Sequence, residues 1–396
     1  MSVENLYMKR RSVLKLMGAT VAAGPMALAR PARAAGPVNI GLLTPLSGAL
    51  AFVGETNQNC LQLAVDEINA QGGLLGREIR IVAEDTQMST QVALDKARKL
   101  IASDDVAMII GTVLPSEREA ALQAAVAGKR LVIHPNFDEG RCHPNLLTTG
   151  LAENQYVEPL IDWAAKNIGK RVYVLASDLG TVRKTFLPRV KASLERVGGS
   201  LAGVQLFPFG TRDFGPAFQQ VKAAAPDIVW HSIGDDPITF VKQYKSFEMK
   251  PQLVTQLAHE SIAVSTAGAS VGDIGVAAYF MSLANAANER FLADYTRKFS
   301  AFTPRRIGDR LVMLPHGENT YAGAKIFAEA ARIAGSLQVD KLQAALPQVA
   351  LELPRGPVRV ARDASHLLCR TLIGRVRMDN GFDVLAQLGP IAPTCG

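Results

Sequence analysis

The feature that most constrains the fold of this chain is a repeated alternation of short β-branched runs with amphipathic stretches of helical period. Residues 38–43 read as a strand, and residues 55–70 read as a helix because their apolar residues recur at the i, i+3, i+4, i+7 spacing of one helical face. The alternation continues to His134 and starts again after Leu151. Such alternation is typical of parallel sheets that are covered by helices on both faces. The sequence therefore predicts two doubly wound α/β units in tandem.

Further strands and helices are expected in both units. In the first unit the pattern predicts strands at 79–83, 106–110 and 130–134, and helices at 90–103 and 116–127. In the second unit it predicts strands at 171–176, 203–207, 227–231, 252–255 and 275–281, and helices at 154–168, 183–197, 214–225 and 236–247.

The last third of the chain has a different pattern. Helices are expected at 287–302, 318–335 and 339–346 without strands between them. Residues 356–386 read as antiparallel strands, with a turn at Asp379-Asn380-Gly381 between the last two. A helical block with so little sheet of its own must pack on one of the α/β units. We therefore expect the chain to cross between the units more than once.

The amino terminus has the three parts of a twin-arginine signal peptide. A basic segment that contains Arg10 and Arg11 precedes an uncharged stretch at 16–29, and Ala32-Arg33-Ala34 forms a small-x-small cleavage site. The apolar stretch is shorter than the about 20 residues that a membrane span needs. We predict a signal peptide at 1–34, export by the twin-arginine translocase and a periplasmic location. The alternatives are an uncleaved anchor and an ordinary disordered tail.

Most of the positive charge belongs to this segment. The whole chain has a formal charge of +7, and residues 1–34 carry six basic residues against one acidic residue, which leaves +2 for the mature chain. The sequence also lacks a cluster of aromatic and basic residues that would indicate single-stranded nucleic acid. Nucleic acid is therefore not an expected partner.

The cysteines and histidines do not form a metal-binding pattern. The cysteines Cys60, Cys142, Cys369 and Cys395 lack C-x-x-C spacing, and the six histidines never occur at H-x-x-x-H spacing. We therefore expect no metal and no cofactor. An oxidising compartment permits disulfides, and four cysteines allow three pairings, among which the sequence does not choose.

Six loops follow the carboxyl ends of expected strands, which is where doubly wound sheets bind their ligands. These loops comprise residues 44–51, 111–116 and 134–140 in the first unit and residues 177–183, 234–237 and 258–261 in the second. Each of them contains polar residues. We expect a binding site where the loops converge.

Pro115 and Ser116 stand where a strand gives way to a helix. Ser116 is expected to cap that helix, and the N–H groups of its first turn would suit a carbonyl or carboxylate oxygen of a ligand. Capping alone is the simpler role for Ser116, and the two roles are compatible.

Ionisable and amide side chains follow other strands. His134 and Asn136 come after a buried strand, in a loop that can equally be a solvated turn. Asp178, Asp235, His259 and Glu260 offer acceptors for an amine or amide N–H. For any single carboxylate among them we expect a surface position rather than one in the site, but we expect at least one of them to face the cleft.

Enzyme signatures are missing from the sequence. Residues 45–49 have neither glycine of the G-x-S-x-G elbow, and Gly128-Lys129 lacks the upstream glycine of a phosphate-binding loop. Gly41 is not followed by the G-x-x-G pattern of dinucleotide binders. Binding without catalysis is therefore the expected class of function.

Several motifs resemble those of a known family. Residues 41–48, residues 64–69 (AVDEIN) with residues 72–77 (GGLLGR), and Asp178 after Ser177 resemble the type I periplasmic solute-binding proteins of the branched-chain amino acid importer family. The pattern P-x-x-x-E-G-x-C-x-P-N-x-x-x-x-G at 135–150 looks like the urea and short-chain amide branch of that family. So does the tail at 354–360, which is followed by His366. The resemblance covers residues 38–387.

The resemblance implies a fold and a role. It implies two α/β lobes of the type I periplasmic binding protein kind, joined by a multi-strand hinge. Residues 36–152 with 284–346 would form one lobe, and residues 153–283 with 347–396 the other. It further implies the receptor subunit of an ABC importer, which captures a small polar ligand of the urea, short-chain amide or amino acid class. That subunit hands the ligand to a permease and ATPase complex in the inner membrane.

The resemblance also points to binding residues. Members that bind urea or amides usually have aromatic residues where this sequence has Val113, His134, Leu179 and Thr181, so we expect a pocket with fewer rings and more ionisable groups. Backbone N–H groups near Ser116 would bind an oxygen, and carboxylates of the second lobe would accept from nitrogen donors. The expected ligand-binding residues are Pro115, Ser116, His134, Asn136, Asp178, Thr181, Asp235, His259 and Glu260.

Three other functions fit parts of the sequence. A ligand-sensing regulator of the amide-sensor type shares the fold but works in the cytoplasm, so the export signal disfavours it. An amidase that uses His134 with Asp138 or Glu139 as acid and base would lack a nucleophile motif. Delivery of the ligand to a chemoreceptor or sensor kinase is not separated from transport by the sequence.

Overall fold

The computed structural model describes residues 36–299, 306–363 and 365–395, and the predicted signal peptide at 1–34 lies outside this part of the chain. None of the helices within these ranges is both long and apolar enough to cross a lipid bilayer.

The first sheet has five parallel strands among the described residues, in the order β2-β1-β3-β4-β5. They are β1 (Val38–Thr44), β2 (Ile79–Asp85), β3 (Met108–Ile110), β4 (Leu131–His134) and β5 (Leu146–Thr148). The helices that follow the first three strands are α1 (Ala51–Ala70), α2 (Thr90–Ala102) and α3 (Pro115–Gly128). Every residue of β3, β4 and β5 is buried, as expected of parallel strands with helices on both faces.

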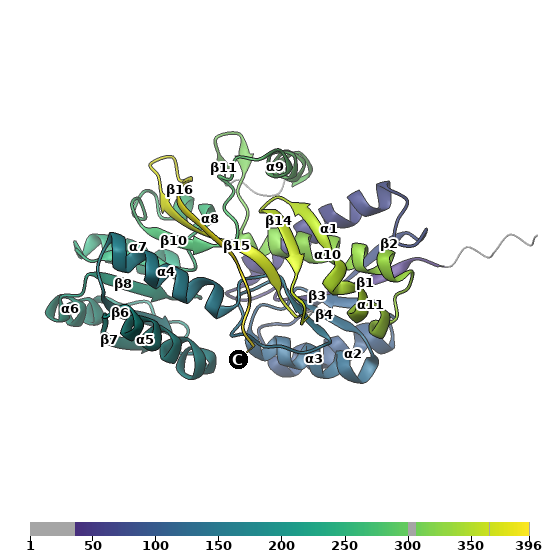
Figure 1. Cartoon of the computed structure of the whole chain (residues 1–396), viewed down its shortest axis with the longest axis horizontal. Helices are drawn as coiled ribbons and strands as arrows, with labels where there is room; N and C mark the ends of the chain where they lie inside the picture. The colour runs from purple at the N-terminus through teal and green to yellow at the C-terminus, as the bar shows by residue number, and fades with distance from the viewer. Residues whose placement is uncertain (1–35, 300–305, 364, 396) are drawn as a thin grey trace, which may run out of the picture. The chain divides into compact units, whose positions relative to one another are not determined.

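The second sheet combines a parallel part with an antiparallel part. The parallel strands are β6 (Arg171–Ser177), β7 (Ser200–Phe207), β8 (Ile228–Ser232), β9 (Gln252–Thr255) and β10 (Ile274–Ala277). The antiparallel strands are β13 (Ala350–Leu353), β14 (Gly356–Val360), β15 (Leu367–Val376) and β16 (Phe382–Ile391). Figure 1 shows β15 and β16 as a long pair beside β10.

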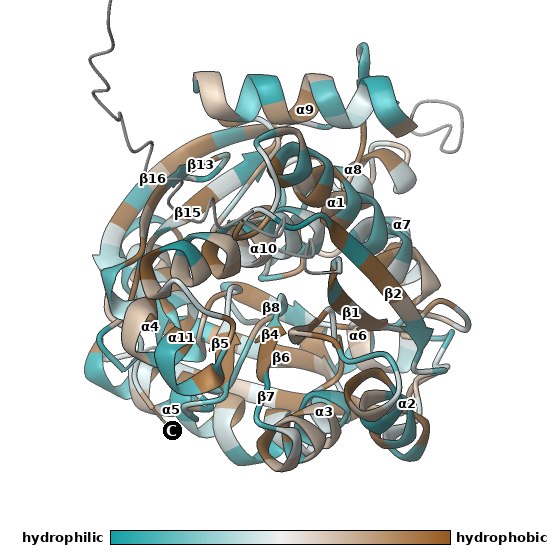
Figure 2. Ribbon diagram, turned by 90° about the vertical axis from the view of Figure 1, so that its right-hand side faces the viewer, coloured by the Kyte–Doolittle hydropathy of each residue, from teal (hydrophilic) through white to brown (hydrophobic). Residues whose placement is uncertain are grey.

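Helices accompany the parallel part of the second sheet. They are α4 (Glu153–Asn167), a π-helical turn (Val182–Phe186) that runs into α5 (Leu187–Arg196), α6 (Gly215–Ala224), α7 (Pro237–Ser246) and α8 (Glu260–Ser265). In Figure 2 the strands β1 and β6 are largely brown, the colour of apolar residues, whereas α9 mixes brown and teal. The apolar core therefore lies along the sheets.

The helical block of the last third returns to the first sheet. It contains α9 (Ala286–Phe299), the hairpin β11 (Arg306–Ile307) and β12 (Arg310–Leu311), α10 (Pro315–Ala334), α11 (Val339–Ala345) and a 3₁₀ turn (Leu346–Gln348). Thr320 Oγ1 of α10 donates to Asn57 Oδ1 of α1 over 3.0 Å. A Cβ atom at Gly323 would lie 2.7 Å from Ile133 Cγ2, so glycine lets α10 approach β4 closely.

The predicted α/β class is confirmed: the chain has two α/β units, one built on a parallel sheet and the other on a sheet with a parallel part. The predicted elements are present, most of them within a few residues of the expected bounds. The sequence did not predict β5, α8, β13 or the hairpin of β11 and β12, because so few residues give only a weak periodic signal. The lobe boundaries inferred from the resemblance stay a prediction.

Candidate ligand-binding site

A cavity of about 170 Å³ lies where loops after the strands of both sheets converge. From the first sheet and its helices it is lined by Leu50, Phe52, Val53, Val113, Leu114, Pro115, Asn136, Phe137, Asp138 and Glu139. From the second sheet it is lined by Ser177, Leu179, Thr181, Val182, Phe186, Phe209, Ser232, Gly234, Pro237, Gln256, Leu257, His259 and Ile262. Glu153 and Tyr156 of α4, with Leu314 and His316 near the start of α10, complete the wall. A protein cavity of about 150 Å³ can hold benzene, so this one has room for a small organic molecule.

Much of the wall is apolar and aromatic. The rings come from Phe52, Phe137, Tyr156, Phe186 and Phe209. Phe137 packs edge to face against Tyr156, with ring centroids 5.5 Å apart, and against His316, at 6.3 Å. The wall therefore contains five rings of phenylalanine and tyrosine, and the expectation of fewer rings than in urea- and amide-binding members stays a prediction.

The amino terminus of α3 faces this cavity through Pro115. The helix begins at Pro115, so Ser116 lies inside the first turn and the predicted capping role of Ser116 is wrong. The buried carboxylate of Glu117 takes that role, accepting the N–H groups of Val113 and Leu114 over 3.2 and 3.0 Å. Proline is favoured at the first helical position, where its missing N–H costs nothing.

Asn136 and His316 form a fixed polar pair in the wall. The Asn136 amide donates to Val113 O over 2.7 Å, and its Oδ1 accepts from Phe137 N and from His316 Nε2, each over 2.8 Å. His316 Nε2 therefore carries the proton, and Nδ1 is an acceptor that has no hydrogen-bond partner among the described residues. Burial lowers the pKa of His316 to about 4, so the ring is neutral at pH 7.

The second sheet contributes side chains that are held by their neighbours. Gln256 Oε1 accepts from Trp230 Nε1 over 2.9 Å, while its Nε2 donates to Ser232 Oγ over 2.7 Å. His259 precedes α8, and burial, followed by the charge of His316, lowers the pKa of His259 to about 3. These groups are neutral hydrogen-bonding partners near neutral pH.

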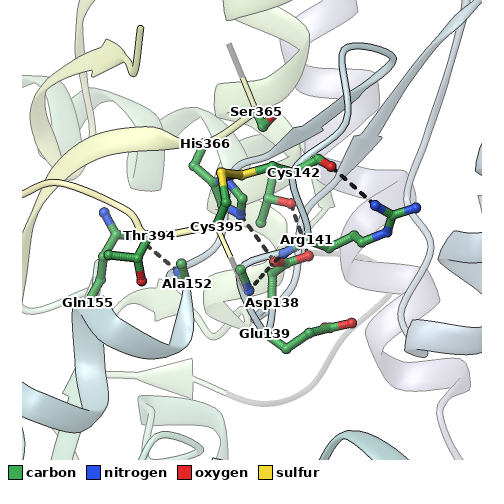
Figure 3. Close-up of polar contacts among 12 residues, drawn as sticks. Asp138, Glu139, Arg141, Cys142, Ala152, Gln155, Ser365, His366, Thr394 and Cys395 are labelled. Carbon is green, nitrogen blue, oxygen red and sulfur yellow. Dashed lines mark hydrogen bonds and ion pairs between the residues drawn. A yellow bond between two sulfur atoms is a disulfide. The ribbon is translucent and has the colours of Figure 1, made fainter. Parts of the chain in front are cut away.

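Two of the three carboxylates of the wall are held by Arg118. The Arg118 guanidinium donates to Asp138 over 2.7 Å and to the two oxygens of Glu139 over 2.9 and 2.6 Å. Asp138 also lies 3.1 Å from His366 Nε2 (Figure 3). It accepts from the N–H of Gly140 over 2.6 Å. Burial alone would raise the pKa of Asp138, but the hydrogen bond from His366 and the charge of Arg118 lower it to about 2.

A disulfide lies near Asp138 and His366 (Figure 3). It joins Cys142 to Cys395 and so selects one of the three pairings that the sequence left open; Cys60 and Cys369 are free and buried. Asp363 and His366 lie near the Cys142 sulfur. Because that sulfur is in the disulfide, it cannot serve as a thiolate ligand for a metal.

Glu153 is the third carboxylate, and its surroundings are different. Its Oε1 accepts from Thr185 Oγ1 over 2.9 Å, whereas Oε2 has no hydrogen-bond partner within the described ranges. The nearest cation is Arg189, whose Nε lies 3.7 Å from Oε2. Burial raises the pKa of Glu153 to about 7, against the opposing effects of Thr185 and Arg189.

Comparison with known proteins places this architecture in a family. A profile of the periplasmic binding protein family matches residues 37–381. The chain belongs to the periplasmic binding protein family. It is 28% identical to the Leu/Ile/Val-binding protein homolog 7 of Brucella suis over 352 residues, which cover 82% of this chain and 84% of the relative.

Solved structures agree with the family. The ABC transporter substrate-binding protein from Sphaerobacter thermophilus is 25% identical to this periplasmic binding protein, with a TM-score of 0.80 over 91% of this chain and 100% of that one. A solute-binding protein of an ABC transporter from R. palustris, solved in complex with benzoate, is 21% identical, with a TM-score of 0.79 over 91% and 99% of the two chains. The latter likeness shows the fold alone. These relatives are solute-binding proteins, which supports a role without catalysis.

Four of the nine residues that the sequence pointed to are brought together in the cavity wall: Pro115, Asn136, Thr181 and His259. They come from both sheets, as expected for a site at the carboxyl ends of strands.

The other five lie outside the wall. Ser116 lies in the first turn of α3, and His134 is fully buried in β4, where its Nδ1 is 2.9 Å from Thr112 Oγ1. Asp178 is paired with Arg183 on the surface over 2.7 Å. Asp235 accepts from Gly210 N over 2.7 Å, and buried Glu260 accepts from Ser282 N over 3.0 Å. Each of these carboxylates therefore has a partner within the protein.

The sequence reading missed Glu153, Tyr156 and His316. Glu153 and Tyr156 lie in the first turn of α4, and His316 follows the proline that begins α10. The search for site residues covered only the loops after strands, and these residues lie at the starts of helices that follow crossings between the sheets. Pro315 is a signal for the start of a helix, and it could have drawn attention to His316, the next residue.

Proposed function

We propose that this periplasmic binding protein is the receptor subunit of an ABC importer and captures a small molecule with an apolar body and a nitrogen-containing polar head. The observation that carries the proposal is the cavity of about 170 Å³ between loops of the two sheets, with an aromatic and aliphatic wall. Small-molecule sites are typically concave, mostly apolar and provided with a few oriented polar groups.

The wall favours a ligand with an apolar body. Rings such as Phe137 and Phe186 lose contacts when the space beside them is empty or holds only water. Urea has no apolar surface to cover them, whereas the side chain of a branched amino acid or the ring of an aromatic amide has. Within the urea and amide branch that the sequence resembles, we therefore favour larger amides, and beside them amino acids.

The charges of the wall favour nitrogen donors. Among the described lining residues there is no Lys or Arg, whereas Asp138, Glu139 and Glu153 are carboxylates. A ligand with only a carboxylate would approach these acids without a cationic side chain to hold it. An amino acid or amide can instead place its oxygen near the amino terminus of α3 and its N–H groups near a carboxylate.

The remaining parts of the proposal come from the sequence. Residues 1–34 would direct export by the twin-arginine translocase to the periplasm. Residues 36–152 with 284–346 and residues 153–283 with 347–396 would act as two lobes that close on the ligand. The closed form would then be recognised by a permease and its ATPase.

Calorimetry against a panel of small molecules tests the proposal. We expect saturable binding of at least one branched amino acid or larger amide, and no binding of urea. Thr181→Trp fills part of the cavity and is expected to abolish binding, while Lys184→Trp, exposed on the same turn, is the matched control. Absence of any ligand from the panel, or equal binding by both variants, would contradict the assignment of this cavity.

A further inference from the structure

We propose that Glu153 binds the nitrogen donor of the ligand and thereby selects amines and amides over carboxylic acids of the same shape. This inference rests on the proposed function, because it assigns a role within the same cavity.

The three carboxylates of the wall are not equivalent. Asp138 and Glu139 share the guanidinium of Arg118, at N–O distances of 2.6 to 2.9 Å. Asp138 has further donors in His366 and in the backbone of the loop that follows it. Their acceptor capacity is thus used within the protein, and neither of them needs a ligand.

Glu153 has the opposite balance of acceptors and donors. Its side chain is 6% exposed, and Oε2 has no hydrogen-bond partner among the described residues. The donor to Oε1 is the hydroxyl of Thr185, which has a single proton. The hydroxyl oxygen also lies 2.8 Å from the carbonyl oxygen of Thr181, so two acceptors share that proton. A buried carboxylate oxygen without a donor is unfavourable. An N–H group of a ligand in the cavity would supply the missing donor.

Arg189 does not supply it. Its Nε lies 3.7 Å from Glu153 Oε2, beyond hydrogen-bond distance, while its Nη1 donates to Glu158 over 2.6 Å. The guanidinium is therefore hydrogen-bonded to Glu158 of α4. It contributes a favourable charge near Glu153 but leaves the oxygen open to the cavity.

The surroundings of Glu153 predict how binding depends on pH. The titratable and charged groups around it are Arg189 on α5, Asp138 and Glu139 after β4, and Tyr156 and Glu158 on α4 itself. Across the cavity, His259 and His316 stay neutral above pH 5 because burial lowers their pKa values to about 3 and about 4.

Glu153 is then the group of the wall that titrates near neutrality, since burial raises its pKa to about 7. A bound ammonium or amide N–H stabilises the ionised carboxylate and lowers that pKa. Binding must therefore release protons near pH 7, and affinity must rise between pH 6 and pH 8.

The first experiment compares ligands that share a shape and differ in the nitrogen. Titration calorimetry would measure leucine against 4-methylpentanoate, and benzamide against benzoate. We expect the member with nitrogen to bind at least about tenfold more tightly in whichever pair binds. Equal affinity within a binding pair overturns the role of Glu153 and leaves the proposed function standing. If neither pair binds, the proposed ligand class fails, and this inference fails with it.

The second experiment removes the charge. Glu153→Gln is expected to weaken the nitrogen-containing probe about tenfold or more and to change its partner less than about twofold. Asp162→Asn is the matched control, since it removes a carboxylate from the same helix at an exposed pair with Arg196. If Glu153→Gln prefers the nitrogen-containing probe as strongly as the unaltered protein does, the proposal is overturned.

A measurement of proton release tests the proposal in the unaltered protein, without relying on Glu153→Gln. Leucine titrations of the unaltered protein at pH 7, in buffers of different ionisation enthalpy, should show proton release on binding. Glu153→Gln, if its circular dichroism shows it folded, should show less release. Binding of leucine without release by the unaltered protein contradicts the proposal even if the variant does not fold.

Discussion

Asp138 and Glu153 are both buried carboxylates in the wall of one cavity, yet their pKa values move in opposite directions. The exposed fractions are 2% for Asp138 and 5% for Glu153, so burial penalises both charges. The pKa of Asp138 nevertheless falls to about 2, while that of Glu153 rises to about 7. The difference lies in donors: Asp138 has Arg118, His366 and a backbone N–H, whereas Glu153 has one shared hydroxyl.

The comparison separates a structural region from a binding region. Around Asp138, an ion pair joins the loop after β4 to α3, and a contact with His366 joins it to the segment before β15. The disulfide joins the same loop to the tail that follows β16. Glu153 lines the cavity, and its Oε2 has no hydrogen-bond donor among the described residues. A carboxylate whose two oxygens both have donors within the protein can hold segments together, and one that keeps an oxygen without a donor can bind a ligand.

The largest effect is expected when the Asp138 region is made to resemble the Glu153 region. Arg118→Met leaves Asp138 and Glu139 without their cation, and breaking a buried pair in this way destabilises proteins by about 3–5 kcal/mol. Urea denaturation followed by circular dichroism measures the loss. The control Arg141→Met removes a half-exposed arginine from the loop that contains Asp138 and Glu139, and it is expected to change stability by less than about 1 kcal/mol. Equal losses would show that Asp138 does not depend on Arg118.

A somewhat smaller effect is expected from the covalent link. The disulfide joins residues 253 positions apart, and its removal by Cys142→Ser with Cys395→Ser is expected to lower the free energy of unfolding by about 2–4 kcal/mol. Ligand affinity should change little, because neither cysteine lines the cavity. A reductant should lower the denaturation midpoint of the unaltered protein and leave that of the double variant in place. The same response from both proteins would argue against this disulfide.

The two α/β units were predictable from local pattern because each helix and strand carries its own period. Residues 90–102 form the expected helix, with the Ser89 hydroxyl accepting from Val92 N at its start. The helix predicted from residue 55 begins at Ala51 instead, because Leu50 and Val53 pack against Val113 in a contact between distant segments. Where tertiary contacts lengthen a helix or strand, its own sequence does not show where it begins.

The candidate site was less predictable because its chemistry depends on which groups find partners. In the sequence, Asp178 and Asp235 look no different from an unpaired carboxylate. Only the folded chain shows that Arg183 and Gly210 donate to them. Glu153 has no motif of its own. The absence of a partner is a property of three-dimensional packing, and a single sequence does not contain it.

The difference between Asp138 and Glu153 can also be tested through the pH dependence of stability. The folded pKa of Glu153 lies above its ordinary value, so its contribution to stability is complete below about pH 4.5 and is lost as the pH rises through about 7. Glu153→Gln should therefore leave stability near pH 4.5 unchanged and raise it at pH 8 by about 1–3 kcal/mol relative to the unaltered protein. Urea denaturation at both pH values measures this. Glu260, whose pKa burial also raises to about 7, keeps part of the slope in the variant. A variant that is less stable at pH 8 would contradict the lack of a hydrogen-bond donor to Glu153 Oε2.

The smallest effect is expected at a carboxylate that is paired but not buried. Asp178 accepts two hydrogen bonds from Arg183, over 2.7 and 2.8 Å, and these lower the pKa of Asp178 much as Arg118 acts on Asp138. Its side chain is 36% exposed, however, so water replaces the pair when it is broken. Asp178→Asn should leave the melting temperature in place and change ligand affinity by less than about twofold. A loss of affinity like that expected of Glu153→Gln would show that Asp178 reaches the ligand, as the sequence first suggested. Burial and pairing are thus both needed for the stability that the Asp138 region provides.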